Sequence, residues 1–177
     1  MKVISIITLL AIAMLPVYPA QAKKAKCIGK VEVASLIKKS IRLEKFGISM
    51  DIPANFRTIA KTDGSITIVD NGVYQWMVCE SNHPGAGGLG TEFSSINVQS
   101  SSTTYLYSNV YDQVPGKEDM YVIVAINGES YQISLRVKTK TGVIEIFKDD
   151  GEPTDGQEQA KYKIQQIIEL AQGVNIL

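Results

Sequence analysis

The stretch that most constrains the fold runs from Met120 to Phe147, where β-forming residues are most concentrated. Asn127-Gly128 lies between two alternating apolar runs. This is the strongest short-range signal of a β-hairpin, because a type I′ turn needs positive φ at both central positions. A second turn, from Thr139 to Gly142, follows in the same chain. We therefore expect an antiparallel three-stranded meander at the centre of a sheet.

Alternation also predicts the register and the faces of this meander. The expected pairs are Ile126 with Glu129, Val124 with Tyr131, Val122 with Ile133, Met120 with Leu135, Val137 with Ile144 and Leu135 with Ile146. These pairs place apolar side chains on one face. The other face is mixed, with Tyr121, Ile123 and Ala125 opposing Ser130, Gln132, Ser134 and Arg136. We expect that second face to be partly covered by loops or by a partner.

A helix is predicted near the C-terminus. Thr154 or Asp155 can cap it, Gln157 or Glu158 can complete a capping box, and Gly173 ends it. Its apolar stripe consists of Ala160, Ile164, Ile167, Ile168 and Ala171. The stripe needs an apolar sheet face to cover, and the meander offers one. The expected fold class is α+β, an antiparallel sheet with a C-terminal amphipathic helix packed on one face.

Residues 1–22 are typical of a signal peptide. Met1-Lys2 is a short positive start, Val3 to Leu15 is apolar, and Ala20-Gln21-Ala22 has the small-x-small pattern of a cleavage site. The apolar stretch is shorter than the ~18 residues of a membrane-spanning helix. We expect an exported protein of the periplasm, the thylakoid lumen or the extracellular space, with no transmembrane span after signal removal and one α+β domain over residues 23–177.

The charge balance argues against two classes of partner. The chain has 18 basic and 18 acidic residues, and removal of Lys2 with the signal leaves 17 against 18. Nucleic acids and anionic membranes both require a concentrated positive field. We therefore expect no nucleic-acid partner. A protein partner in the cell envelope is the kind of partner that we expect instead.

The two cysteines, Cys27 and Cys79, are candidates for a disulfide in an exported chain. The bond would join the start of the mature chain to the end of a predicted strand. Two unpaired thiols are the alternative. The two cysteines and the distant His83 lack the spacing of a zinc site, so no metal site is predicted.

Two segments allow both helix and strand. In residues 31–43, Val33, Leu36 and Ile37 fit helical spacing, whereas Ile41 and Leu43 alternate. Residues 70–76 contain a second Asn-Gly, which predicts a hairpin that folds residues 66–69 onto residues 73–79; a single helical turn is the alternative. Between them, residues 46–52 alternate as a strand that Pro53 ends.

No residue set favours catalysis. Residues 81–91 form a Gly-rich loop that satisfies G-x-G-x-x-G, but the expected strand after it argues against dinucleotide binding, and no cofactor is predicted. His83, the single histidine, lies in this loop, so a hydrolase using His83 is the alternative hypothesis. The candidate binding residues are His83, Tyr105, Tyr107, Tyr121 and Arg136.

The segment FGISMDIPANFR, an apolar strand stopped by Pro53 and followed by an aromatic residue, resembles the opening of PsbP-like exported domains. A second pattern is similar to small exported proteins of photosynthetic bacteria and is matched by Pro53, Asn55, Phe56, Arg57, Asp63 to Ile66, Tyr74 and Cys79. Both resemblances imply an α+β sandwich. They also imply a noncatalytic binding or assembly role outside the cytoplasm, which is the function we expect.

Overall fold

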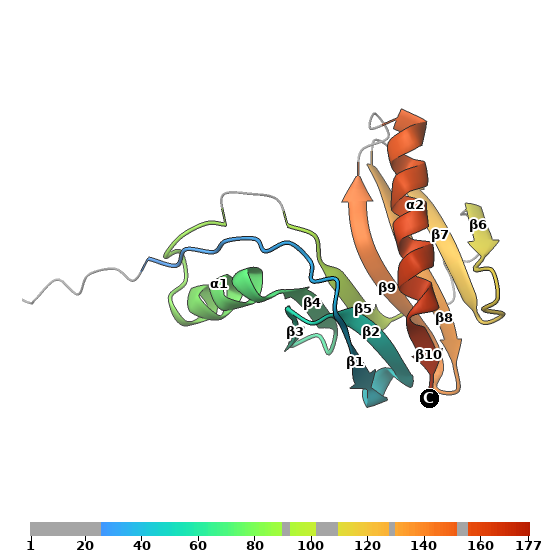
Figure 1. Cartoon of the computed structure of the whole chain (residues 1–177), viewed down its shortest axis with the longest axis horizontal. Coiled ribbons are helices and arrows are strands. Elements are labelled where there is room, and N and C mark those ends of the chain that lie inside the picture. Colours follow the sequence, from blue (N-terminus) through green and yellow to red (C-terminus); the bar gives the residue numbers. More distant parts are fainter. Residues whose placement is uncertain (1–25, 90–92, 102–109, 128–129, 152–155) are drawn as a thin grey trace, which may run out of the picture.

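The computed structural model describes residues 26–89, 93–101, 110–127, 130–151 and 156–177. In these ranges the chain is a strand-dominated α+β protein with two antiparallel sheets and two α-helices (Figure 1). The elements are β1 (Lys38–Leu43), the 3₁₀ turn η1 (Glu44–Phe46), β2 (Ile48–Pro53), β3 (Phe56–Ala60), β4 (Ile66–Asp70), α1 (Asn71–Asn82), β5 (Ile96–Ser100), β6 (Val110–Gln113), β7 (Met120–Asn127), β8 (Ser130–Thr139), β9 (Gly142–Gly151), α2 (Gly156–Gln172) and β10 (Val174–Ile176).

The larger sheet has the strand order β3-β4-β5-β9-β8-β7-β6, and the smaller sheet has the order β1-β2-β10. The predicted meander is confirmed as β7, β8 and β9. It lies inside the larger sheet, because β5 pairs with β9 on one side and β6 pairs with β7 on the other. Strands from both halves of the chain therefore complete the sheet around it.

The predicted register of the first hairpin is wrong by two residues. Ile126 pairs with Tyr131 and Val122 with Leu135, and Asn127 pairs with Ser130. A shift of two keeps every side chain on its predicted face. In the observed register Asn127 belongs to β7 and lacks a positive φ, so it does not occupy a central position of the expected type I′ turn. The predicted register of the second hairpin, with Val137 opposite Ile144, is confirmed.

One buried apolar cluster joins the two sheets. Ile48, Met50 and Ile52 alternate along β2 and are buried, as the sequence predicts. They belong to the same cluster as the apolar face of the meander and as two residues of α2. Helix α2 lies along β7 and β8, as Figure 1 shows. The cluster includes Leu43, Ile68, Val98, Val122, Ile133, Leu135, Ile146, Ile167, Ala171 and Val174.

The two ambiguous segments are resolved differently. In residues 31–43, the alternating part is β1, and residues 31–37 form neither helix nor strand. In residues 70–76, the predicted hairpin is wrong, because the chain forms the helix α1. The Asp70 side chain accepts hydrogen bonds from the backbone N–H groups of Gly72 and Val73, which is a helix N-cap. Gly72 also lacks the positive φ that a type I′ turn needs.

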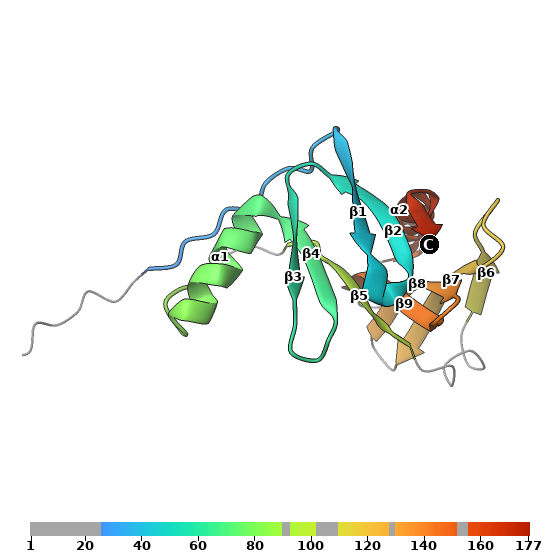
Figure 2. The same ribbon diagram turned by 90° about the horizontal axis from the view of Figure 1, so that it is seen from below.

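Helix α1 packs on the second face of the larger sheet at its β3 and β4 end. Val73 of α1 and Val69 of β4 are both fully buried. Figure 2 shows α1 beside β3 and β4, well separated from α2. Further along the same face, Ile123 and Ser134 are also buried, so the centre of the predicted mixed face is covered.

Candidate functional site

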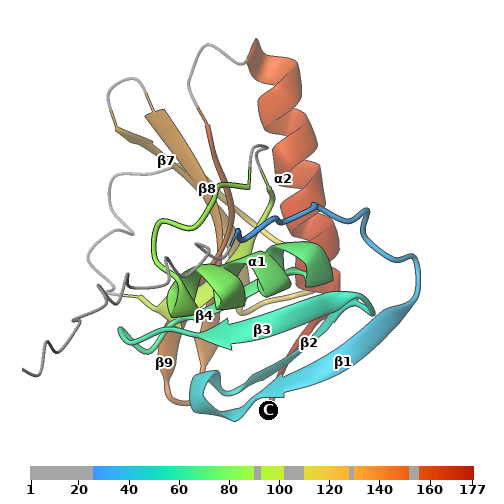
Figure 3. The same ribbon diagram turned by 90° about the vertical axis from the view of Figure 1, so that its left-hand side faces the viewer.

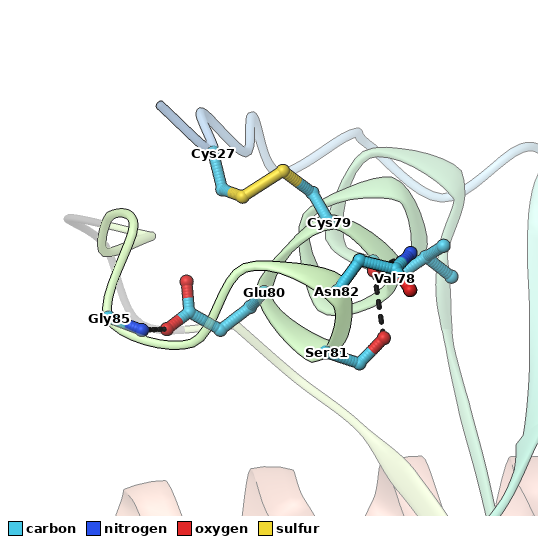
Figure 4. Close-up of a disulfide and its surroundings, with 7 residues drawn as sticks. All are labelled: Cys27, Val78, Cys79, Glu80, Ser81, Asn82 and Gly85. Carbon is cyan, nitrogen blue, oxygen red and sulfur yellow. Dashed lines mark hydrogen bonds between the residues drawn. A yellow bond between two sulfur atoms is a disulfide. The ribbon is translucent and has the colours of Figure 1, made fainter. Parts of the chain in front are cut away.

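Residues 26–37, which we call the strap, run beside α1 and then turn into β1 (Figures 2 and 3). A disulfide between Cys27 and Cys79 fixes its start (Figure 4). The Cα atoms are 5.6 Å apart, within the usual range for this bond. The predicted pairing is confirmed, although Cys79 lies in the last turn of α1 and not in a strand.

Two glycines allow the strap to lie close to α1. A Cβ atom built on Gly29 would be 2.6 Å from the Cβ of Trp76, and one built on Gly72 would collide with the carbonyl oxygen of Lys30. Neither position has room for a side chain. These contacts hold Gly29 and Lys30 of the strap against the first half of α1.

Asp70 connects the strap to the start of α1. The same carboxylate oxygen that caps the helix also accepts a hydrogen bond from the backbone N–H of Glu32 at 3.1 Å. Asp70 is 2% exposed. Three N–H donors and the positive end of the helix dipole stabilise this buried carboxylate. The cap of α1 and the position of the strap are therefore coupled through one side chain.

Asn55 holds the far end of the strap. Its side-chain oxygen accepts from the backbone N–H of Ser35 at 2.9 Å, and its side-chain nitrogen donates to the carbonyl oxygen of Val33 at 3.0 Å. The backbone N–H of Ala54 donates to the carbonyl oxygen of Ile37 at 2.8 Å. The amide group of Asn55 thus binds the strap backbone at Val33 and at Ser35, and the strap reaches β1 in a fixed position.

The strap turns its aliphatic side chains outward. The exposed fractions are 92% for Val33, 100% for Leu36 and 73% for Ile37. Single exposed apolar residues are common on proteins, but three within five positions of a hydrogen-bonded segment form a local apolar patch. We call Val33, Leu36 and Ile37 the strap surface. It is our candidate functional site.

Two of the predicted binding residues are neighbours in the sheet. Tyr121 pairs with Arg136 across β7 and β8, and the Nζ atom of Lys138 lies 4.9 Å from the centre of the Tyr121 ring. Arg136 forms an ion pair with Glu145 at 2.8 Å, and their side chains are 5% and 9% exposed. Glu145 also accepts a hydrogen bond from the Ser101 hydroxyl at 3.1 Å. The positive charge of Arg136 is therefore paired with Glu145 inside the sheet.

The other predicted binding residues lie elsewhere. His83 is exposed at the C-terminal end of α1, far along the sheet order from Arg136. The hydroxyl of Ser81, the nucleophile nearest in sequence, donates to the Val78 carbonyl oxygen, as Figure 4 shows. Tyr105 and Tyr107 are outside the described residues. Within the described part of the chain, no three His, Cys, Asp or Glu side chains are grouped so that they could hold a metal ion.

Sequence reasoning missed Asn55 and Asp70 as residues that position the site. A signal was present for each. Asp70 precedes a segment that was considered as a helical turn, and Asp is a favoured N-cap residue. Asn55 belongs to the pattern that carries the second resemblance, and its contact with the strap supplies a physical reason for an amide at that position.

Comparisons of the chain with protein-family models, with curated proteins and with solved structures found no match. The PsbP-like resemblance therefore stays a prediction. In the ranges that the structure describes, neither helix combines the length and the apolar composition needed to cross a bilayer.

Proposed function

We propose that the protein is a noncatalytic binding or assembly module that contacts a protein partner through the strap surface. One observation carries the proposal: three aliphatic side chains point into solvent from a backbone that Asn55 and the disulfide hold in place. An ordered segment loses little conformational entropy when it binds, so such a patch is prepared for association.

The size of the patch fits a specific contact. Full burial of one Val, Leu or Ile side chain contributes roughly 1.5 to 3 kcal/mol, so the three together offer roughly 4.5 to 9 kcal/mol before the costs of association. Loss of one of them would remove roughly 2 kcal/mol, which corresponds to a decrease in affinity of about 30-fold. The strap surface is therefore sufficient to anchor an interface that other contacts complete.

The proposed place of action is an exported compartment. The disulfide supports it, because such bonds persist in oxidising environments and are rare in the cytosol. The signal-like pattern of residues 1–22 points the same way, although these residues are outside the described ranges. We further propose that α2 is a permanent cover of the meander and not part of the interface, which Ile167 and Ala171 in the buried cluster support.

The test is recovery of the partner from the envelope of the producing organism. Tagged wild-type protein, Leu36→Asp and a matched control, Tyr162→Asp, are cross-linked in intact cells and purified. Tyr162 is a suitable control because it is also a large exposed side chain, at 63%, but lies on α2. We expect one partner with the wild-type and control proteins and a loss of about 30-fold with Leu36→Asp. Equal recovery with all three, or free monomer throughout, would contradict the proposal.

A further inference from the structure

The strand that follows the strap has an unpaired edge. β1 is an outer strand of the three-stranded sheet, and within the described residues β2 is the strand that pairs with it. The backbone N–H of Asp51 donates to Gly173 on the β10 side, so the odd-numbered residues of β2 direct their backbone groups away from β1. The register then makes Lys39, Ile41 and Leu43 the hydrogen-bonded partners of β2.

The alternate residues of β1 consequently direct their backbone groups outward. These are Lys38, Ser40 and Arg42, and all three residues are exposed. In the part of the chain that the structure describes, no strand pairs with this edge. Three N–H donors and three carbonyl acceptors are thus presented in the spacing that an added β-strand requires.

The side chains at this edge indicate the chemistry of the partner. Lys38 and Arg42 carry positive charge on the same face as Ser40, and Arg42 also forms an exposed ion pair with Glu44 at 2.8 Å. The opposite face of β1 carries Ile41 and Leu43, which reach the core. Paired residues on adjacent strands share a face. An added strand with alternating acidic and aliphatic residues would place its acids beside Lys38 and Arg42 and its aliphatic side chains beside Ile41.

We propose that the partner supplies an extended, acidic and apolar segment that pairs with β1 as a new edge strand. This proposal rests on the proposed function, because a strand that continued past Lys38 would also cover Ile37 and Leu36. It commits to hydrogen bonding by the backbone of β1, whereas the proposed function requires only contact with the strap surface.

The test uses the disulfide-bonded protein and an octapeptide of alternating Val and Glu, with an alternating Val and Lys peptide as control. Amide hydrogen exchange is followed by NMR. With saturating Val-Glu peptide, exchange at Lys38, Ser40 and Arg42 slows by about tenfold or more, while the Lys39 and Ile41 amides, already bonded to β2, change little. The Val-Lys peptide produces no such protection.

Two variants test the hydrogen bonds and the charge separately. Ser40→Pro removes an outward N–H without removing a bond to β2, and Ser40→Ala is its matched control. Peptide binding is lost in Ser40→Pro and kept in Ser40→Ala. Lys38→Glu, which leaves the backbone unchanged, weakens binding of the Val-Glu peptide even if Ser40→Pro does not fold.

Several outcomes would overturn this proposal. Equal binding to Ser40→Pro and Ser40→Ala, or peptide binding that leaves the three outward amides unprotected, excludes strand addition. Protection that appears without peptide and rises with protein concentration identifies a second copy as the occupant. Binding to phosphatidylglycerol vesicles in place of the peptide identifies a lipid surface. If envelope capture depends on Leu36 but survives Ser40→Pro, the proposed function stands and strand addition fails.

Discussion

Removing one member of the Arg136–Glu145 pair should destabilise the fold strongly. The two side chains are 2.8 Å apart and almost fully buried. Glu145→Ala removes the carboxylate that lies 2.8 Å from this buried guanidinium, and loss of one partner of such a pair costs about 3 to 5 kcal/mol. The Ser101 hydroxyl would lose its bond to Glu145 as well. Replacing both residues, as in Arg136→Met with Glu145→Leu, removes both buried charges and should restore most of the stability.

Urea unfolding followed by circular dichroism measures this effect. With a slope of about 2 kcal/mol per molar, a loss of about 4 kcal/mol lowers the midpoint by about 2 M for Glu145→Ala, while the double variant stays within about 0.5 M of wild type. A loss below about 1 kcal/mol for Glu145→Ala would match an exposed ion pair and refute the buried geometry. A double variant as unstable as the single one would show that the loss does not come from an uncompensated charge.

Three further predictions concern the scaffold. Cys79→Ser should lower stability by up to about 4 kcal/mol in thermal or urea unfolding, from loop-closure entropy over a separation of 52 residues, and a wild-type value under non-reducing conditions would contradict it. Ile167→Ala should cost about 2 to 5 kcal/mol in urea unfolding and Tyr162→Ala less than about 0.5, because only Ile167 is buried; equal costs would argue against α2 as a permanent cover. Asp63 should titrate with a pKa below its ordinary value of about 3.9, because it accepts hydrogen bonds from the Ser65 hydroxyl and N–H. Its small stabilising effect is complete above the unfolded pKa and is lost as pH falls through the folded pKa, and an NMR titration with an unshifted midpoint would contradict this.

The meander was predictable because its signals are local. Turn residues and alternation specify the strands and their faces, as the pairing of Val137 with Ile144 confirms. The two-residue error at Asn127 has the same origin, since both registers keep the faces, and alternation alone does not decide whether Asn127 ends the strand or enters the turn. The short strands β3, β6 and β10 were missed because their partners supply the reason for them to be strands.

The candidate site was harder to predict because its order comes from distant residues. The spacing of Val33, Leu36 and Ile37 fits a helix, whereas their segment forms neither helix nor strand and all three side chains are exposed. Their segment is held by Asn55, about twenty positions away, through side-chain bonds that leave no periodic pattern. At Asn71, the local turn signal was outweighed by the side chain of Asp70, which both caps α1 and accepts a hydrogen bond from the strap at Glu32.

The central claim, that the strap surface is the binding site, is tested most directly by a photo-cross-linking residue at position 36. The same residue at position 162 is the control, since both side chains are exposed but lie on different elements. We predict an adduct of one partner at position 36 and none at position 162. Excess unlabelled wild-type protein should suppress this adduct, and excess Leu36→Asp protein should not. Equal adducts at both positions, or suppression by the Leu36→Asp protein, would contradict the claim.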